Sequence, residues 1–92
     1  MYLELIKKGY EVLVGKVGDK EVDFVATNSD GIKYFQVGLT VREKSTYERE
    51  IKPLFEIKNH FPKYVITLDN DPKAIDEGII IQNVFEWLDN EK

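Results

Sequence analysis

The sequence predicts an α/β domain in which helices flank a mixed sheet, with the element order α-β-β-β-α-β-β-α. Three observations support this fold class. Period-two segments separated by glycine-containing turns fill residues 10–41, helical spacing of apolar residues begins at Ser45, and two apolar runs follow at 63–69 and 78–81. Strands joined by short turns pair antiparallel, whereas a strand reached through a helix usually lies parallel to its neighbour, so the sheet is expected to be mixed.

The N-terminal half is predicted to be a short helix followed by a three-stranded meander. Leu3, Leu5 and Ile6 have helical spacing, and Lys7-Lys8-Gly9 is typical of a helix C-terminus. Three strand segments follow, with glycine-containing turns between them; the strands are 10–14, 20–26 and 32–41, and the turns are 15–19 and 27–31.

The C-terminal half is predicted to be helix, strand, strand and helix. Ser45 and Glu48 match a capping box at the start of a helix that Pro53 bends and Pro62 ends. After the strands at 63–69 and 78–81, Asn83 is expected to cap a last helix, which turns one apolar face to the core: Val84, Trp87 and Leu88.

Length and composition indicate one small domain, residues 1–92, with a net charge of −4 and no cysteine. The acidic balance does not favour nucleic acid as a partner, because such partners are held largely by phosphate neutralisation. No run of apolar residues is long enough for a bilayer span and no signal peptide is recognisable, so we expect a cytoplasmic protein without membrane association. A G-x-x-x-x-G-K-[ST] loop is absent from the sequence, so the chain cannot itself bind ATP in the P-loop manner.

Asp23 and Gln36 are the main candidate site residues. Asp23 is an acid inside an apolar alternation, where Glu21, Asp23 and Val25 are expected to share one face of a strand, and Val22, Phe24 and Ala26 the other. Gln36 lies on the next strand, and the hairpin is expected to place it beside Asp23. Oxygen ligands of this kind suit Mg²⁺ or Mn²⁺.

The chain resembles the PD-(D/E)XK nuclease superfamily, and more closely the C-terminal domain of unknown function carried by many predicted bacterial and archaeal AAA+ type ATPases. The likeness covers nearly the whole chain and rests on the order and spacing of five segments: Leu5-Ile6-Lys7-Lys8-Gly9-Tyr10-Glu11-Val12, Lys20-Glu21-Val22-Asp23-Phe24-Val25-Ala26, Tyr34-Phe35-Gln36-Val37, Thr46-Tyr47-Glu48-Arg49-Glu50 and Pro62-Lys63-Tyr64-Val65-Ile66. It implies a restriction-endonuclease-like core, and a chain that is a fragment or the C-terminal domain of a larger ATPase.

The resemblance also assigns site positions. Glu4 matches the acid of the family's first helix, Asp23 its metal-binding aspartate and Gln36 its second ligand. Gly38 occupies the position of the lysine that polarises water and stabilises negative charge in the transition state. Lys16 or Arg49 could replace that cation from a neighbouring element.

Three function hypotheses follow. The first is a catalytically degenerate nuclease-like domain that docks to or regulates an ATPase in the same or a partner chain; in it an Asp23→Ala protein folds normally. The second is a metal-dependent nuclease that uses Asp23 and Gln36, with or without Glu4, and a relocated Lys16 or Arg49. The third is an interaction module that forms a homodimer through a sheet edge or the first helix. Because of Gly38 and the acidic net charge, the first is preferred over the nuclease, and it predicts no cleavage of DNA or RNA.

Overall fold

The computed structural model describes residues 2–17 and 20–90, with side chains at 3–15 and 22–89. One six-stranded sheet in the order β1-β2-β3-β4-β6-β5 forms the centre of the molecule. Its neighbours are antiparallel at β1–β2, β2–β3 and β5–β6, and parallel at β3–β4 and β4–β6. The predicted α/β class, with a mixed sheet flanked by helices, is confirmed. The element bounds are α1 Tyr2–Lys7, β1 Glu11–Val17, β2 Lys20–Asn28, β3 Gly31–Val37, α2 Lys44–Phe55, β4 Lys63–Thr67, β5 Ala74–Asp76, β6 Ile79–Asn83 and α3 Val84–Asn90.

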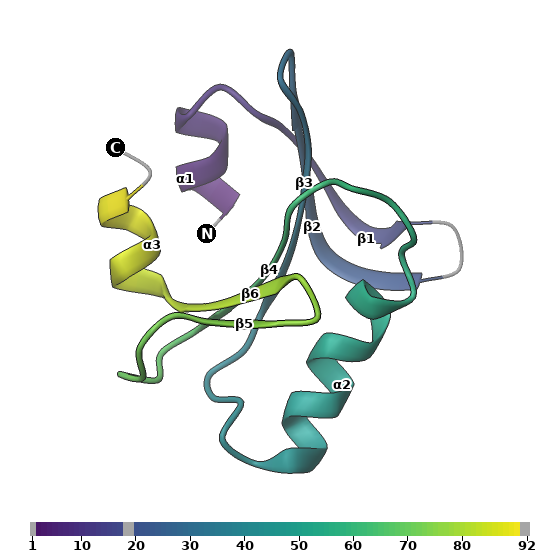
Figure 1. The fold of residues 1–92 in the computed structure, drawn as a ribbon. Coiled ribbons are helices and arrows are strands. Elements are labelled where there is room, and N and C mark those ends of the chain that lie inside the picture. The colour runs from purple at the N-terminus through teal and green to yellow at the C-terminus, as the bar shows by residue number, and fades with distance from the viewer. Residues whose placement is uncertain (1, 18–19, 91–92) are drawn as a thin grey trace.

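The helices form a layer on each face of the sheet. Figure 1 shows α2 on one face and the short helices α1 and α3 together on the other. Each face has its own buried apolar cluster: Val22, Val25, Tyr34, Ile51, Leu54, Val65 and Ile79 under α2, and Leu5, Ala26, Phe35, Ile66 and Trp87 under α1 and α3. The Trp87 ring meets Phe35 edge to face, with centroids 5.5 Å apart, so the prediction that Trp87 belongs to the core is confirmed.

The predicted element order was wrong at one point, because it lacked β5. This strand is only three residues long and mostly exposed, so no period-two pattern marked it. A two-residue turn with positive φ at both Glu77 (53°) and Gly78 (83°) joins it to β6. The Tyr47 hydroxyl of α2 donates a hydrogen bond to Asp76 and ties this edge strand to the helix.

Several predicted boundaries also need correction. β1 continues through Gly15, whose φ of 116° accompanies a shift of register, to Val17, so the turn predicted at 15–19 is wrong at 15–17; residues 18–19 lie outside the described part of the chain. β3 ends at Val37 rather than at residue 41, although the chain still bonds β4 through the Gly38 amide and the Ile66 carbonyl, 3.0 Å apart. The last predicted strand begins at Ile79, after the turn that contains Gly78.

α2 differs from its prediction at both ends. Glu43 is the N-cap residue and makes no side-chain cap bond, so the capping box expected at Ser45 is not formed. The helix contains Pro53, as predicted, but it ends at Phe55 and not at Pro62. The loop after α2 folds over the Lys63 ammonium, which donates hydrogen bonds to the Asn59 and Phe61 carbonyls of this loop.

The ends of the short helices confirm their predicted signals. Gly9 has a φ of 90°, and the Gly9 and Tyr10 amides donate to the Ile6 and Leu5 carbonyls, which is a Schellman motif. The Asn83 side-chain oxygen accepts bonds from the Phe85 and Glu86 amides at 2.8 and 3.3 Å and so caps α3. Within the described residues, no helix has the length and apolar character needed to cross a membrane.

Candidate functional site

A β-bulge places Asp23 outside the ladder between β1 and β2. Val14 pairs with Phe24 and Gly15 pairs with Val22, so Asp23 is the extra residue on β2. The bulge reverses the alternation beyond it: Val22 is buried with Val25 in the cluster under α2. The prediction that Val22 shares a face with Phe24 and Ala26 was therefore wrong, because strict alternation cannot anticipate an inserted residue.

Asp23 and Gln36 lie side by side, as the hairpin predicted, and bond each other's strands through their side chains. Regular pairing of β2 with β3 stops at Phe24 and Phe35. Beyond it the Asp23 amide donates to Gln36 Oε1 at 2.9 Å, and the Val37 amide donates to Asp23 Oδ2 at 2.8 Å. We call these two bonds the Asp23–Gln36 lock. It replaces the backbone bonds of the ladder, and Gln36 is buried while Asp23 is exposed.

Glu50 on α2 is the second carboxylate of this site. Its side chain is 16% exposed, and the position of a Cβ at Gly38 would lie 3.8 Å from Glu50 Cγ. Burial, and then the negative charge of Asp23, raise the pKa of Glu50, whereas Arg49 opposes the shift. The arrangement is a pair of neighbouring carboxylates over the end of β3, on the α2 face of the sheet.

Sequence reasoning missed Glu50, although a signal for it existed. Tyr47, Ile51 and Leu54 mark the inward face of α2, and Glu50 lies at the i+3 position of the same stripe. Burying an acid at an inward helical position costs free energy unless the acid is paired, so such an acid is itself a signal of a functional site.

The other predicted site residues are not brought to Asp23 in the same way. Glu4 belongs to α1, on the opposite face of the sheet from Glu50. Arg49 is 74% exposed, and its Nε lies 3.7 Å from Glu50 Oε1, so its charge is directed to Glu50. Lys16 is on β1, but its side chain is outside the described residues. A Cβ at Gly38 would meet Glu50 and the Thr40 carbonyl at ordinary van der Waals distances of 3.8–3.9 Å.

The donor set fits a tightly held cation poorly. In the described part of the chain, no three His, Asp or Glu side chains converge on one point where a metal ion could be held. Gln36 directs its carbonyl oxygen to a backbone amide, and one Asp23 oxygen does the same. Asp23 and Glu50 are the two carboxylates left to meet a cation, and Mg²⁺ would take its other ligands from water or a substrate phosphate.

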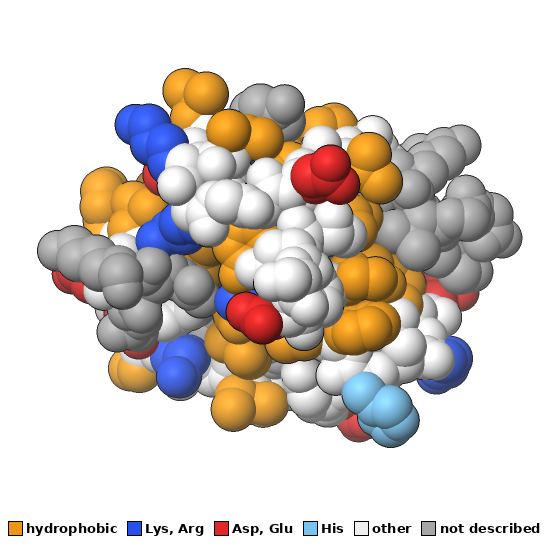
Figure 2. Space-filling view, turned by 90° about the horizontal axis from the view of Figure 1, so that it is seen from above, with side chains coloured by type: hydrophobic (Ala, Val, Ile, Leu, Met, Phe, Trp, Pro, Cys, Tyr) orange, Lys and Arg blue, Asp and Glu red, His pale blue; other side chains and the backbone are white. Residues whose placement is uncertain are grey.

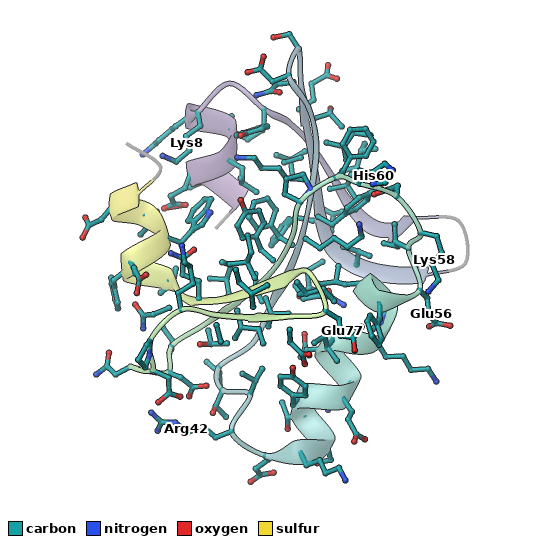
Figure 3. All side chains as sticks on the ribbon, viewed as in Figure 1. Lys8, Arg42, Glu56, Lys58, His60 and Glu77 are labelled. Atoms are coloured by element: carbon teal, nitrogen blue, oxygen red, sulfur yellow. The ribbon has the colours of Figure 1, made fainter. Side chains whose placement is uncertain are left out.

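Three basic residues in or next to α2, Arg42, Lys44 and Arg49, pair with acids rather than forming a phosphate-binding patch. Arg42 Nε and Nη2 donate to the two carboxylate oxygens of Asp71 at 3.1 and 3.2 Å, which raises the pKa of Arg42. Lys44 pairs with Glu48 across one helical turn at 4.0 Å. Figure 3 places Arg42 far from Lys58 and His60, and in Figure 2 the Lys and Arg side chains of one face are dispersed among apolar and acidic ones.

A buried acid at the end of β4 has a structural role. Asp69 Oδ2 accepts a bond from the Val41 amide at 2.9 Å, and Asn83 donates to the Asp69 carbonyl. A bond from the Thr40 side chain, followed by the Val41 amide, lowers the pKa of Asp69. These bonds join the loop before α2 to the ends of β4 and β6 and account for the burial of this carboxylate.

An apolar hollow of about 310 Å³ adjoins the site on the other face of the sheet. Leu39 and Leu68 at its rim are 78% and 54% exposed. The hollow meets the carboxylates at Val37, whose amide binds Asp23, and at Gly38, which faces Glu50. Its lining residues are Val37, Gly38, Leu39, Ile66, Thr67, Leu68 and Val84.

Comparison with known proteins gives one relative. An uncharacterized protein of Haemophilus influenzae is 35% identical over 88 residues, which are 96% of this chain and 21% of that protein. No family model and no solved structure matches the sequence significantly. The chain thus spans about a fifth of the length of the relative it matches.

Proposed function

We propose that this chain is a catalytically degenerate nuclease-like domain with a restriction-endonuclease-like core, which serves as a docking or regulatory module for an ATPase domain. The observation that carries the proposal is the Asp23–Gln36 lock. Oxygens that would hold a cation in an active relative are bonded to backbone amides, so they hold two strands together.

The cation needed for phosphodiester cleavage is also missing from the described side chains around Asp23. Gly38 stands at the position of the expected lysine, and Arg49 pairs with Glu50. An exposed guanidinium beside a carboxylate has much of its charge compensated, so it stabilises a developing phosphate charge poorly. The site therefore presents negative charge where nucleic acid also brings negative charge.

The surface beside the lock suits a protein partner better than nucleic acid. Exposed Leu39 and Leu68 border an apolar hollow, and its lining residues Val37 and Gly38 contact Asp23 and Glu50 of the other face of the sheet. A bulky apolar side chain with a neighbouring Lys or Arg would complement both features. We assign this partner to the ATPase domain that the family resemblance implies; the relative has room for a further domain, since roughly four fifths of its length lie outside the match.

The test uses the ATPase part and this domain, expressed separately from the polypeptide that contains both, and measures their association by analytical ultracentrifugation. Leu39→Asp should weaken association at least about tenfold, since truncating central apolar contacts costs more than 1 kcal/mol. Leu13→Asp, at an exposed position of β1 away from the hollow, is the control. Equal affinities for wild type and Leu39→Asp would refute docking at this surface.

A second candidate function is a metal-dependent nucleic-acid phosphodiesterase. Glu50 favours it, because this side chain supplies next to Asp23 the second carboxylate that Gln36 does not provide. In this alternative Asp23 and Glu50 hold Mg²⁺ or Mn²⁺, which would activate water, and Lys16 or Arg49 supplies the missing positive charge. Metal-dependent cleavage that is lost in both Asp23→Asn and Glu50→Gln would establish it.

A further inference from the structure

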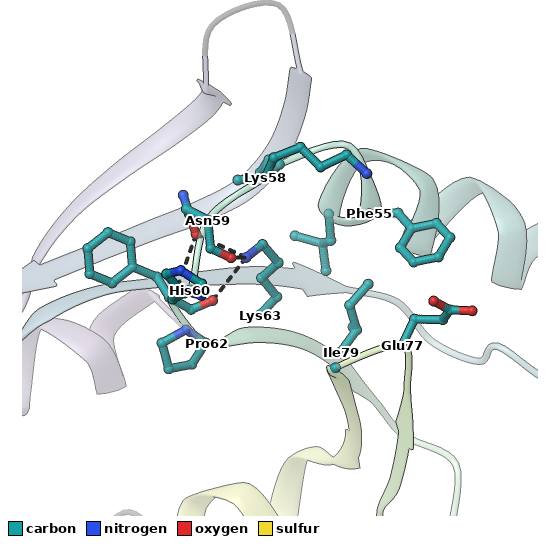
Figure 4. Close-up of a pocket in the computed structure, with 12 residues that line it drawn as sticks. Phe55, Lys58, Asn59, His60, Pro62, Lys63, Glu77 and Ile79 are labelled. Carbon is teal, nitrogen blue, oxygen red and sulfur yellow. Dashed lines mark hydrogen bonds between the residues drawn. The ribbon is translucent and has the colours of Figure 1, made fainter.

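A cavity lies at the opposite end of the sheet from the Asp23–Gln36 lock. It has a volume of about 470 Å³, within the usual range of small-ligand sites, and is formed by the loop after α2, the start of β4 and the turn between β5 and β6. Figure 4 shows Lys58, Lys63, Phe55 and Glu77 around it.

A buried ammonium group forms one wall. Lys63 is 7% exposed, and its Nζ donates to the Asn59 carbonyl, Asn59 Oδ1 and the Phe61 carbonyl, each at 3.0 Å. These acceptors are neutral, and among the described side chains no carboxylate pairs with this ammonium. Burial lowers the pKa of Lys63, which is the effect of a charge removed from water without a counter-charge.

The rest of the wall combines apolar surface with further titratable groups. Leu54, Ile57, Ile79 and the half-exposed rings of Phe55 and Phe61 supply the apolar part. Lys58 lies over the Phe55 ring at 5.9 Å, and His60 is on the same loop. This cavity therefore combines the buried positive charge of Lys63, the long side chain of Lys58 and an apolar wall. Such a lining is complementary to an anion that also carries an apolar group.

The strained residue of this region also faces the cavity. Glu77 has a φ of 53°, which a glutamate rarely adopts, and its exposed side chain lies on the Phe55 side of the cavity, as Figure 4 shows. Its negative charge disfavours an anion in the cavity, whereas the positive charges of Lys58 and Lys63 favour one.

We propose that this cavity binds a small organic anion, with its carboxylate or phosphate group toward Lys58, where the buried charge of Lys63 also attracts it, and an aromatic or branched aliphatic body against Phe55 and Ile79. The site is separate from the lock, so the inference does not rest on the proposed docking function.

The test is a titration of the ¹⁵N-labelled chain, observed by NMR, with benzoate, phenyl phosphate and uncharged benzyl alcohol. Saturable shifts of the Asn59, His60 and Gly78 amides are expected with an anion and not with the alcohol, and the tighter of the two anions identifies the anionic group. Because Lys63 staples the loop, exposed Lys58 and Glu77 carry the mutational test. Lys58→Gln should weaken binding by about fivefold and Glu77→Gln should strengthen it by about threefold, the scale of exposed charge contacts.

Lys52→Gln is the matched control, since it removes the same charge from an exposed position of α2 that does not line the cavity. It should leave the affinity unchanged. Any of three results would overturn the proposal: no saturable shift with either anion, equal binding of benzyl alcohol, or equal weakening by Lys52→Gln and Lys58→Gln.

Discussion

Removal of the Asp23 carboxylate should destabilise the domain rather than abolish an activity. Asp23→Ala deletes the acceptor of the Val37 amide, a 2.8 Å bond to a charged group. Such bonds contribute about 1.5–3 kcal/mol, and because Asp23 is exposed and water can reach the amide, we expect a loss of about 1–2 kcal/mol. Asp23→Asn keeps an oxygen acceptor and should cost less than about 0.5 kcal/mol. The sequence-based expectation that Asp23→Ala folds normally is thus refined to a folded but less stable protein.

Gln36→Ala should cost more, about 2–3 kcal/mol, because it removes a buried side chain and leaves the Asp23 amide without its acceptor. The double variant should lose about 0.5–1 kcal/mol less than the sum of the single losses, since both bonds close the same strand junction.

Urea denaturation followed by the fluorescence of buried Trp87 measures these losses. Asp30→Ala is the control for charge, because the Asp30 carboxylate is exposed and lies in the turn between β2 and β3. Equal free energies of unfolding for Asp23→Ala and Asp30→Ala would show that the Asp23–Gln36 lock does not stabilise the junction of β2 and β3.

Three further predictions concern single side chains. Burial raises the pKa of Glu50 above its value in the unfolded chain, so the contribution of this side chain to stability is lost as pH rises from the unfolded-state pKa through the folded-state pKa. At pH 7, Glu50→Gln should therefore unfold at a higher temperature than the wild type. Equal melting temperatures at pH 7 would contradict this. Glu77→Asn relieves a positive φ and should raise the melting temperature by roughly 3–6 °C, about 0.5–1 kcal/mol, whereas a lower value would show that the turn is unstrained. Gly38→Lys fits the space beside Glu50 and should fold with stability within about 1 kcal/mol of wild type; a larger loss by urea denaturation would show that the position is closed.

The fold class could be predicted because its signals are local. The glycine after α1, the asparagine before α3 and the apolar stripe of the last helix each act within a few residues. β5 could not be predicted in the same way, because Ile75 is an isolated apolar residue whose strand exists only through pairing with β6 and the bond from Tyr47. The end of α2 was missed for a similar reason: the loop after it is organised by Lys63, which follows it in sequence.

The candidate site was predictable as a position and not as chemistry. Hairpin register brings Asp23 and Gln36 together, and this could be inferred from two strands. The bulge at Asp23 depends on how β1 aligns with β2, and the contact with Glu50 depends on how α2 packs over the sheet. Both are tertiary features, and together they decide that the oxygens bond backbone amides and that a second carboxylate lies nearby.

A cleavage assay tests most directly whether the proposed nuclease-like site is degenerate. The purified chain is incubated with single- and double-stranded DNA and RNA in the presence of Mg²⁺ or Mn²⁺, beside Asp23→Asn and Glu50→Gln. We predict no cleavage above the rate of the buffer by any of the three proteins. Reproducible metal-dependent cleavage by the wild type that both substitutions abolish would contradict the claim and establish the phosphodiesterase alternative.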